Sequence, residues 1–156
     1  MISTKLVLTL LIAISGYTGY AIPGELPQIT TMPHDDLARR VCNRPCQVFG
    51  FTLPSGEILL DEGLAVGADP AATSILVHEL THFLQLRSDA RPLPITCEVW
   101  REREREAFSV QTRWLQDASG SVQMFSVAMN RLNFGALHTV CFGRSGAVPP
   151  ESWSKG

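Results

Sequence analysis

The feature that most constrains the fold is a pair of histidines four residues apart in an apolar segment. His78 and His82 project from the same face if this segment is a helix, because four residues make slightly more than one turn. Asp69 followed by Pro70 is typical of a helix start, so we expect a helix from residue 70 to about residue 86. The opposite face carries apolar side chains, namely Leu76, Leu80, Phe83 and Leu84. The two histidines are therefore expected on a rigid helix that is anchored in the core.

This arrangement of histidines favours a metal site. Two imidazoles on one helix face can bind one metal ion through their ring nitrogens. Glu79 lies beside the pair, where it can reach a metal-activated water without being a ligand itself. We therefore predict one bound zinc ion, held by His78 and His82, with Glu79 as a catalytic base. The alternative is that both histidines are only packed in the core or exposed to solvent, which leaves the glutamate between them unexplained.

A hydrolytic zinc site usually has three protein ligands, so a third must come from elsewhere in the chain. The charged run at residues 101–106 lies in a second expected helix, residues 98–116. Helical spacing places Glu104 on the apolar face of this helix, with Trp100, Ala107, Phe108, Gln111 and Leu115. A carboxylate in an apolar stripe needs a cation, so Glu104 is the predicted third ligand, and Glu106 is the alternative. Glu102 and the arginines of the run are expected to be solvated.

The remaining pattern predicts a small α+β domain. A short helix is expected at residues 34–41, with two aspartates at its start and two arginines at its end. Apolar runs on either side of Pro54-Ser55-Gly56 predict a β-hairpin formed by residues 47–53 and 57–61. Further along the chain we expect an irregular segment at 89–94, a third helix at 121–132 and a loose tail at 143–156.

The N-terminus has the pattern of a signal peptide. Lys5 precedes an apolar run at residues 6–14, and Gly19 with Ala21 makes a small-residue cleavage site. We expect residues 1–21 to be removed and residues 22–156 to form a single domain without a stable membrane anchor. The alternative is an uncleaved short anchor or a buried first helix. On the first interpretation the protein is exported to the periplasm or the medium.

The cysteine count agrees with export. Cys42, Cys46, Cys97 and Cys141 are an even set, which in an oxidising compartment favours two disulfides. Of the three possible pairings, we prefer Cys42 with Cys46 and Cys97 with Cys141. A zinc site at Cys42 and Cys46 is the rival interpretation, although a second close pair of ligands is missing.

Charge excludes one large class of function. The chain carries 13 basic and 15 acidic residues, for a formal net charge of −2. The basic residues are scattered, so the electrostatic footprint of a nucleic-acid-binding protein is lacking. We therefore expect no nucleic-acid partner.

The chemistry-bearing residues resemble the gluzincin branch of the zincin metallopeptidases. The resemblance lies in residues 78–83, His-Glu-Leu-Thr-His-Phe, followed on a later helix by residues 104–107, Glu-Arg-Glu-Ala. It spans residues 57–116 and includes an apolar strand, 58–60, before the first motif. The chain also looks like small exported bacterial domains of unassigned function that carry Cys-x-x-x-Cys before such a motif.

The resemblance implies that the two histidines and the downstream glutamate bind zinc and that Glu79 is the general base. Larger members of the family add a tyrosine, histidine or arginine that stabilises the oxyanion. Here both tyrosines, Tyr17 and Tyr20, lie in the expected signal peptide. Only His138 or Arg113 could fill that role, and His138 is the predicted catalytic partner of Glu79.

The predicted function is therefore zinc-dependent hydrolysis of peptide bonds by an exported enzyme. A first rival is a zinc-stabilised binding protein or inactive relative, in which the metal only joins two helices. A second rival is a metal-free partner domain of the cell envelope, with Trp100, Trp114 and Trp153 as interface anchors. The oligomeric state is not readable from the pattern.

Overall fold

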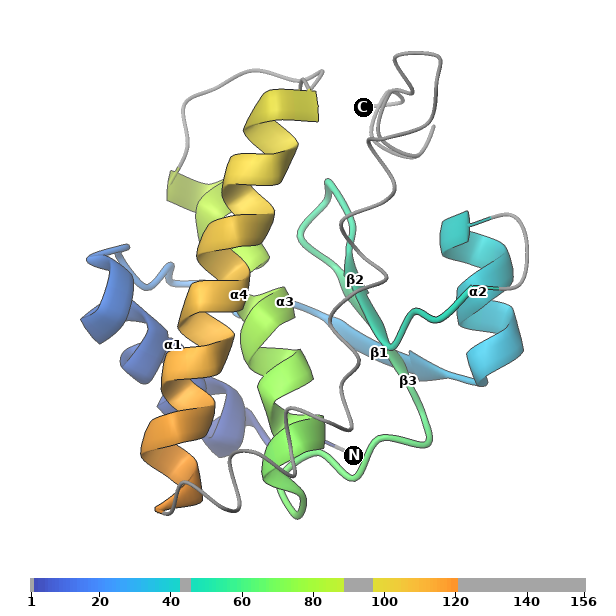
Figure 1. Ribbon diagram of the computed structural model, residues 1–156, viewed down its shortest axis with the longest axis horizontal. Helices are drawn as coiled ribbons and strands as arrows, with labels where there is room; N and C mark the ends of the chain where they lie inside the picture. Colours follow the sequence, from blue (N-terminus) through green and yellow to red (C-terminus); the bar gives the residue numbers. More distant parts are fainter. Residues whose placement is uncertain (1, 43–45, 89–96, 121–156) are drawn as a thin grey trace.

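In the computed structural model, helices lie on both sides of a small β-sheet (Figure 1). The structure describes residues 2–42, 46–88 and 97–120. Within these ranges the elements, in chain order, are α1 (Thr4–Thr18), β1 (Ile29–Met32), α2 (His34–Cys42), β2 (Gly50–Thr52), β3 (Ile58–Asp61), α3 (Pro70–Ser88) and α4 (Cys97–Ser119). The α+β fold class and the helices expected at 34–41, 70–86 and 98–116 are confirmed, with bounds that differ by at most three residues.

The described sheet has the order β1-β3-β2. The pair β2 and β3 is antiparallel, with Phe51 opposite Leu59, so the expected hairpin is confirmed. Gly56 makes its turn with a positive φ of 90°, which glycine adopts without the steric cost of a Cβ. Strand β1 is an element that the sequence pattern does not predict. It pairs in parallel with β3, and a parallel partner so far along the chain leaves no local pattern.

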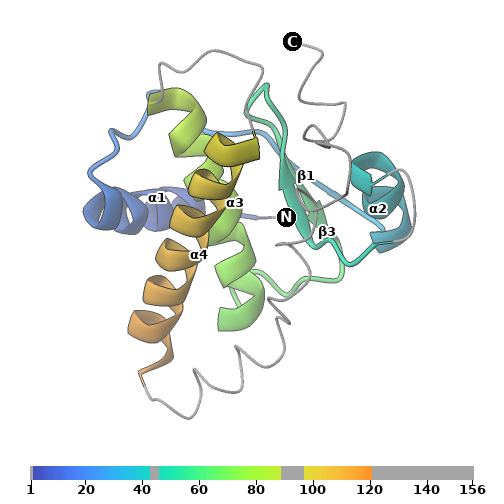
Figure 2. The same ribbon diagram turned by 45° about the horizontal axis from the view of Figure 1, so that its top comes forward.

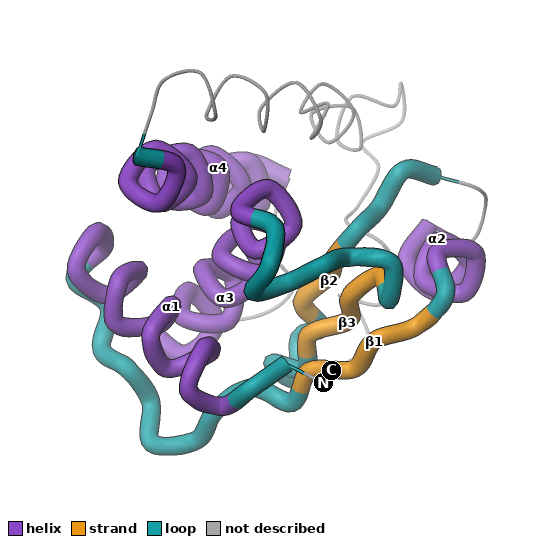
Figure 3. Tube along the Cα trace, turned by 90° about the horizontal axis from the view of Figure 1, so that it is seen from below, coloured by secondary structure: helices purple, strands orange, loops and turns teal. Residues whose placement is uncertain are grey.

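The sheet separates two packed layers, and Figure 3 shows α1, α3 and α4 on one side of it and α2 on the other. The alternation of side chains along β3 accounts for this. Ile58 and Leu60 pack in the core cluster that contains α1 and α3, whereas Leu59 packs with Leu37 and Ala38 of α2. Each face of the central strand is therefore covered by helices.

Helix α3 is the centre of the molecule, and its residues from Ala71 to Gln85 are all buried. Its start follows the expected pattern, because the Asp69 carboxylate accepts a hydrogen bond of 2.9 Å from the Ala71 backbone N–H. The apolar side chains at Leu76, Leu80 and Phe83 are fully buried, as a core-facing stripe requires. The polar face is buried as well, because α4 packs against it (Figure 2). The site of interest is thus formed where α3 and α4 meet.

Helix α1 contains the segment expected to be a signal peptide, and in the full chain it packs on α3 and α4. The Ser3 hydroxyl accepts a hydrogen bond from the Leu6 N–H at its start, and Gly19 ends it in a left-handed conformation. Leu10, Leu11 and Ile14 are buried in the same core cluster as α3. None of the helices in the described ranges is long and apolar enough to cross a membrane.

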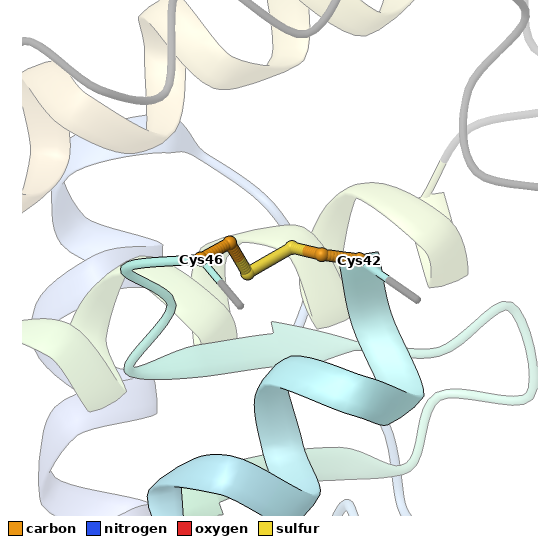
Figure 4. The surroundings of a disulfide bond; sticks show 2 residues. All are labelled: Cys42 and Cys46. Atoms are coloured by element: carbon orange, nitrogen blue, oxygen red, sulfur yellow. A yellow bond between two sulfur atoms is a disulfide. The ribbon is translucent and has the colours of Figure 1, made fainter. Parts of the chain in front are cut away.

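A disulfide joins Cys42, at the end of α2, to Cys46, on the segment that leads to β2 (Figure 4). This confirms the first preferred pairing and replaces the rival zinc site at these two cysteines. Several predictions fall on residues or side chains outside the described part of the chain. They are the pairing of Cys97 with Cys141, the irregular segment at 89–94, the helix at 121–132, the tail, and the roles of Trp153 and His138.

Candidate metal centre

Three potential ligand side chains meet between α3 and α4. His78 and His82 lie one turn apart on α3, and Glu104 faces them from α4. The Nε2 atoms of His78 and His82 are 3.0 Å apart, and they lie 3.3 Å and 3.1 Å from the two carboxylate oxygens of Glu104. One ligand atom from each residue lies within 4.8 Å of the other two. The described side chains thus form a three-donor cluster from two helices.

The spacing of these donor atoms fits a small tetrahedral cation. In a tetrahedral zinc site with bonds of about 2.0–2.1 Å, neighbouring ligand atoms are separated by about 3.3–3.4 Å. The two Nε2 atoms are 3.0 Å apart, and each lies 3.1 or 3.3 Å from a different oxygen of Glu104, so each of these separations is near the edge length. Nitrogen and carboxylate donors in this number are also typical of zinc. The cluster could therefore hold a metal ion.

Glu104 meets a second criterion for a ligand. Its side chain is buried, and within the described part of the chain its Oε2 atom accepts no well-formed hydrogen bond, since its contact with His78 Nε2 is long, at 3.3 Å. A buried carboxylate oxygen without a partner is costly unless a cation balances it. Glu106 is placed differently: its Oε2 accepts hydrogen bonds from Gln85 and from the Tyr20 hydroxyl. The structure thus brings Glu104, and not Glu106, to the two histidines. Within the same run Glu102, Arg101 and Arg105 are exposed as expected, but Arg103 is buried, so the expectation of a solvated side chain is wrong for this residue.

The electrostatics of the cluster show how strongly it attracts positive charge. Burial by itself would raise the pKa of the Glu104 carboxyl, but the charges and hydrogen bonds of His82 and His78 outweigh it and hold that pKa well below its usual range. Burial likewise opposes protonation of His82, yet the Glu104 charge and hydrogen bond, followed by the Glu79 charge, raise the pKa of His82 to about 9. Without a metal, a proton on His82 partly compensates Glu104.

Glu79 lies beside the cluster and outside its three-donor set. Burial raises the pKa of its carboxyl, although the charges of His78 and His82 and a hydrogen bond from Thr52 act in the opposite direction. The Thr52 hydroxyl lies 2.7 Å from Glu79 Oε2 and 3.0 Å from the Glu79 carbonyl oxygen. A carboxyl group with a raised pKa, held in one orientation next to a cation site, is suited to accept and release a proton.

Strand β2 shapes the space around Glu79. A Cβ added at Gly50 would lie 2.8 Å from Glu79 Cγ and 2.9 Å from its Oε1. Only a residue without a side chain lets the strand approach the carboxyl so closely. Neither Gly50 nor Thr52 was expected at the site, since only the tertiary packing of the hairpin on α3 brings them there.

Two glutamines complete the surroundings of the histidines. Gln85 lies three residues after His82 on α3, and its Oε1 is 2.8 Å from His82 Nδ1. Gln111 lies on α4, and its Oε1 is 3.1 Å from His78 Nδ1. Gln111 had been assigned to the same helix face as Glu104, but neither glutamine was expected to contact a ligand. The i, i+3 spacing of His82 and Gln85 is the sequence signal that could have found the first.

Of the two candidates for oxyanion stabilisation, Arg113 is the one in the described part of the chain, and it packs against Tyr17. The Arg113 guanidinium lies over the ring of Tyr17, 4.5 Å from its centroid, on the side where α1 meets α4. The Tyr17 hydroxyl donates a hydrogen bond to Asp117, and Tyr20 donates one to Glu106. His138 lies outside the described residues.

No known protein family, curated protein or solved structure matches this chain, so its site must be interpreted from its own geometry.

Proposed function

We propose that this protein is a zinc-dependent hydrolase that cleaves peptide bonds. The observation that carries the proposal is the position of Glu79. Its buried carboxyl lies next to the three-donor cluster, and the charge of this carboxyl helps to raise the pKa of His82. A metal site that only stabilises the fold needs no proton acceptor beside it. A hydrolytic site needs one, because the attacking water must lose a proton.

Each residue then has a distinct role. His78, His82 and Glu104 hold the zinc ion, which when bound supplies Lewis-acid chemistry that polarises a carbonyl and acidifies water. Glu79 accepts the proton of the attacking water and returns it to the nitrogen of the departing amine. Thr52 fixes the orientation of the Glu79 carboxyl through its hydrogen bond. Gly50 leaves the space in which that carboxyl lies.

An extended peptide is the substrate that suits this surface. Strand β3, which forms the strand predicted at 57–61, is central in the described sheet and cannot pair with a substrate. Strand β2 is at an edge of that sheet, and its residues Gly50 and Thr52 lie against Glu79. A peptide added alongside an edge strand gains main-chain hydrogen bonds and passes close to the reacting groups. This role is an analogy from the resemblance to the gluzincins.

We place the enzyme outside the cytosol, as an exported protein from which residues 1–21 are removed. The apolar N-terminal run and the Cys42–Cys46 disulfide support this, because disulfides persist in oxidising compartments. In the full chain the same run forms α1, so its removal would uncover apolar parts of α3 and α4.

A catalytically weak, zinc-stabilised binding protein is the second candidate. The observation that favours it is burial: His78, Glu79, His82 and Glu104 are only 6%, 6%, 8% and 9% exposed. A substrate carbonyl must reach the ion, so an enzyme with this site needs an opening movement that a binding protein does not.

Substitution of Glu79 distinguishes the two functions. Glu79→Gln keeps the size of the side chain but deletes the base, so zinc content should stay at about one per chain while peptide cleavage falls roughly 10²–10⁴-fold. The measurements are metal analysis and cleavage of a broad peptide library, with and without a chelator. Glu62→Gln, an exposed position, is the matched control and should behave as wild type.

Two outcomes would contradict the proposal. Loss of zinc from Glu79→Gln would make Glu79 a ligand, and cleavage at the wild-type rate would remove its role as base. Zinc binding by the wild type without any chelator-sensitive cleavage would leave the binding protein as the better description.

A further inference from the structure

The second ring nitrogen of each histidine in the cluster faces a glutamine. His82 Nδ1 is 2.8 Å from Gln85 Oε1, and His78 Nδ1 is 3.1 Å from Gln111 Oε1. Both glutamine side chains are buried. Two histidines on one helix thus have the same kind of partner, one contributed by α3 itself and the other by α4.

The remaining hydrogen bonds determine which way each amide points. The Gln111 NH₂ group donates to Ser74 Oγ at 3.1 Å, and the Ser74 hydroxyl in turn donates to the Ala71 carbonyl. The Ser74 oxygen therefore acts as an acceptor toward Gln111. If the Gln111 amide were flipped, its NH₂ group would face the imidazole and this hydrogen bond would be lost.

Gln85 is held in the same way by two acceptors on α4. Its NH₂ group donates to the Arg103 carbonyl at 3.0 Å and to Glu106 Oε2 at 2.8 Å. Both acceptors lack a proton to give, so the amide oxygen of Gln85 must be the atom that faces His82. Glu106, which lies two residues after Glu104, thereby orients the partner of a ligand without contacting the metal cluster.

An amide oxygen can only accept a hydrogen bond, so each imidazole must carry its proton on Nδ1. In the neutral imidazole, which is the form that binds a metal, the lone pair is then on Nε2, and the Nε2 atoms are the ones that face Glu104. We propose that Gln85 and Gln111 are positioning residues that fix His82 and His78 in the tautomer that binds zinc through Nε2, and that Glu106 orients Gln85. The inference rests on the zinc binding of the proposed function and not on hydrolysis.

Zinc affinity tests the two glutamines. Gln85→Met and Gln111→Met keep chain length but remove the acceptor oxygen, and each should weaken zinc binding roughly 10–100-fold, as loss of such partners does at other zinc sites. Gln116→Met, at an exposed position of α4, is the matched control and should leave affinity unchanged. The measurement is competition with a chromophoric chelator, and wild-type affinity in both buried variants would overturn the proposal.

Histidine NMR of the zinc-loaded wild-type chain provides a readout that does not depend on any variant folding. Long-range ¹H–¹⁵N spectra should show Nε2 ligation and a proton on Nδ1 for His78 and His82. Ligation through Nδ1 at either residue would overturn the proposal. If this pattern is found but no peptide is cleaved, the inference stands and the proposed hydrolase fails.

A double-mutant cycle tests Glu106. If Glu106 acts through Gln85, Glu106→Gln should lower zinc affinity by less than Gln85→Met, and the double variant should bind zinc as Gln85→Met does. Glu102→Gln, one turn earlier on the exposed side of α4, controls for the loss of a negative charge. Additive losses in the double variant would show that Glu106 acts independently and would remove its positioning role.

Discussion

At the scale of single residues, Glu104 and Glu106 show how two identical side chains on one helix acquire different roles. They are about 200° apart around the axis of α4, so they cannot face the same neighbours. Glu104 faces His78 and His82, whereas Glu106 receives hydrogen bonds from Gln85 and Tyr20. A direct donor to the ion and a group that orients another side chain should respond differently to the same substitution.

Glu104→Gln should therefore bind zinc at least about 100-fold more weakly than wild type, because loss of a direct charged ligand should exceed the 10–100-fold effect of losing a partner of a ligand. Glu106→Gln should have a smaller effect. Chelator competition measures both affinities under the same conditions. The opposite ranking would mean that α4 presents the other face to α3.

Gly50 is a second position where one atom matters. In Gly50→Ala the added Cβ would lie 2.8 Å from Glu79 Cγ and 3.0 Å from Leu60 Cδ2, so the carboxyl must move. A displacement of about 1 Å at a catalytic group can cost roughly 10²-fold, so kcat/KM should fall by about that factor while zinc is retained. Gly24→Ala, where a Cβ would meet nothing within 4 Å, is the control. Wild-type turnover by Gly50→Ala would show that the position of Glu79 is not limiting.

At the scale of elements, the hairpin and α3 depend on each other. The turn between β2 and β3 lies against α3, and a Cβ at Gly56 would be 3.3 Å from two atoms of the Phe83 ring. The hairpin also carries Thr52, which binds Glu79. Distortion of the turn is therefore expected to affect both stability and the site.

Gly56→Ala should lower the free energy of unfolding by more than Gly120→Ala. Both glycines have positive φ, at 90° and 61°, so each substitution costs about 1–2 kcal/mol of backbone strain. Only Gly56 adds a tight contact, since a Cβ at Gly120 would meet nothing within 4 Å. Urea unfolding of both variants measures the difference. Equal losses would show that the Phe83 ring moves aside freely.

At the scale of the whole molecule, the main question is whether α1 stays in the mature protein, because much of the core packs against it. It covers α3 and α4 with Leu10, Leu11 and Ile14, and its C-terminal end reaches Glu106 through Tyr20. The Arg113 side chain lies over Tyr17 at the same boundary. Removal of residues 1–21 would therefore uncover apolar surface and remove one hydrogen bond from Glu106.

The chain has two tyrosines, Tyr17 and Tyr20, and both lie in residues 1–21, so their signal tests whether this segment is removed. In the full chain, burial and then the hydrogen bond and charge of Asp117 raise the pKa of Tyr17 to about 12. Because this lies above the free value of about 10, the contribution of the phenol to stability is present below pH 10 and lost as the pH rises through about 12. Absorbance titration of the unprocessed chain should show that Tyr17 ionises only near pH 12.

Protein recovered after export should show no tyrosine absorbance, because cleavage after Ala21 removes both residues. It should also unfold at lower urea concentration than the unprocessed chain, since the apolar faces of α3 and α4 lose their cover. Intact mass gives the cleavage point. An exported chain that keeps both tyrosines would show that α1 is a permanent part of the domain.

Local patterns were enough to predict α2, α3 and α4 and the face on which the chemistry lies. The spacing of His78 and His82 and the apolar stripe around Leu80 follow the period of an α-helix, and Asp69-Pro70 is a local signal for a helix start. All three can be recognised within a short segment of sequence. The same period placed Glu104 on the apolar face of α4. The hairpin was predictable because its two strands are joined by a short turn with Gly56.

Contacts between distant segments could not be read in this way. The parallel pairing of Ile29 with Ile58, the approach of Gly50 to Glu79 and the contact of Gln111 with His78 join residues far apart in the chain. No periodicity encodes such pairs, because they depend on how packed layers meet. By itself, the sequence determined which side chains can hold a metal and on which helices they lie. Only the tertiary structure decided that Glu104 meets the histidines while Glu106 binds Gln85, since that choice depends on the rotation of α4 as it packs against α3.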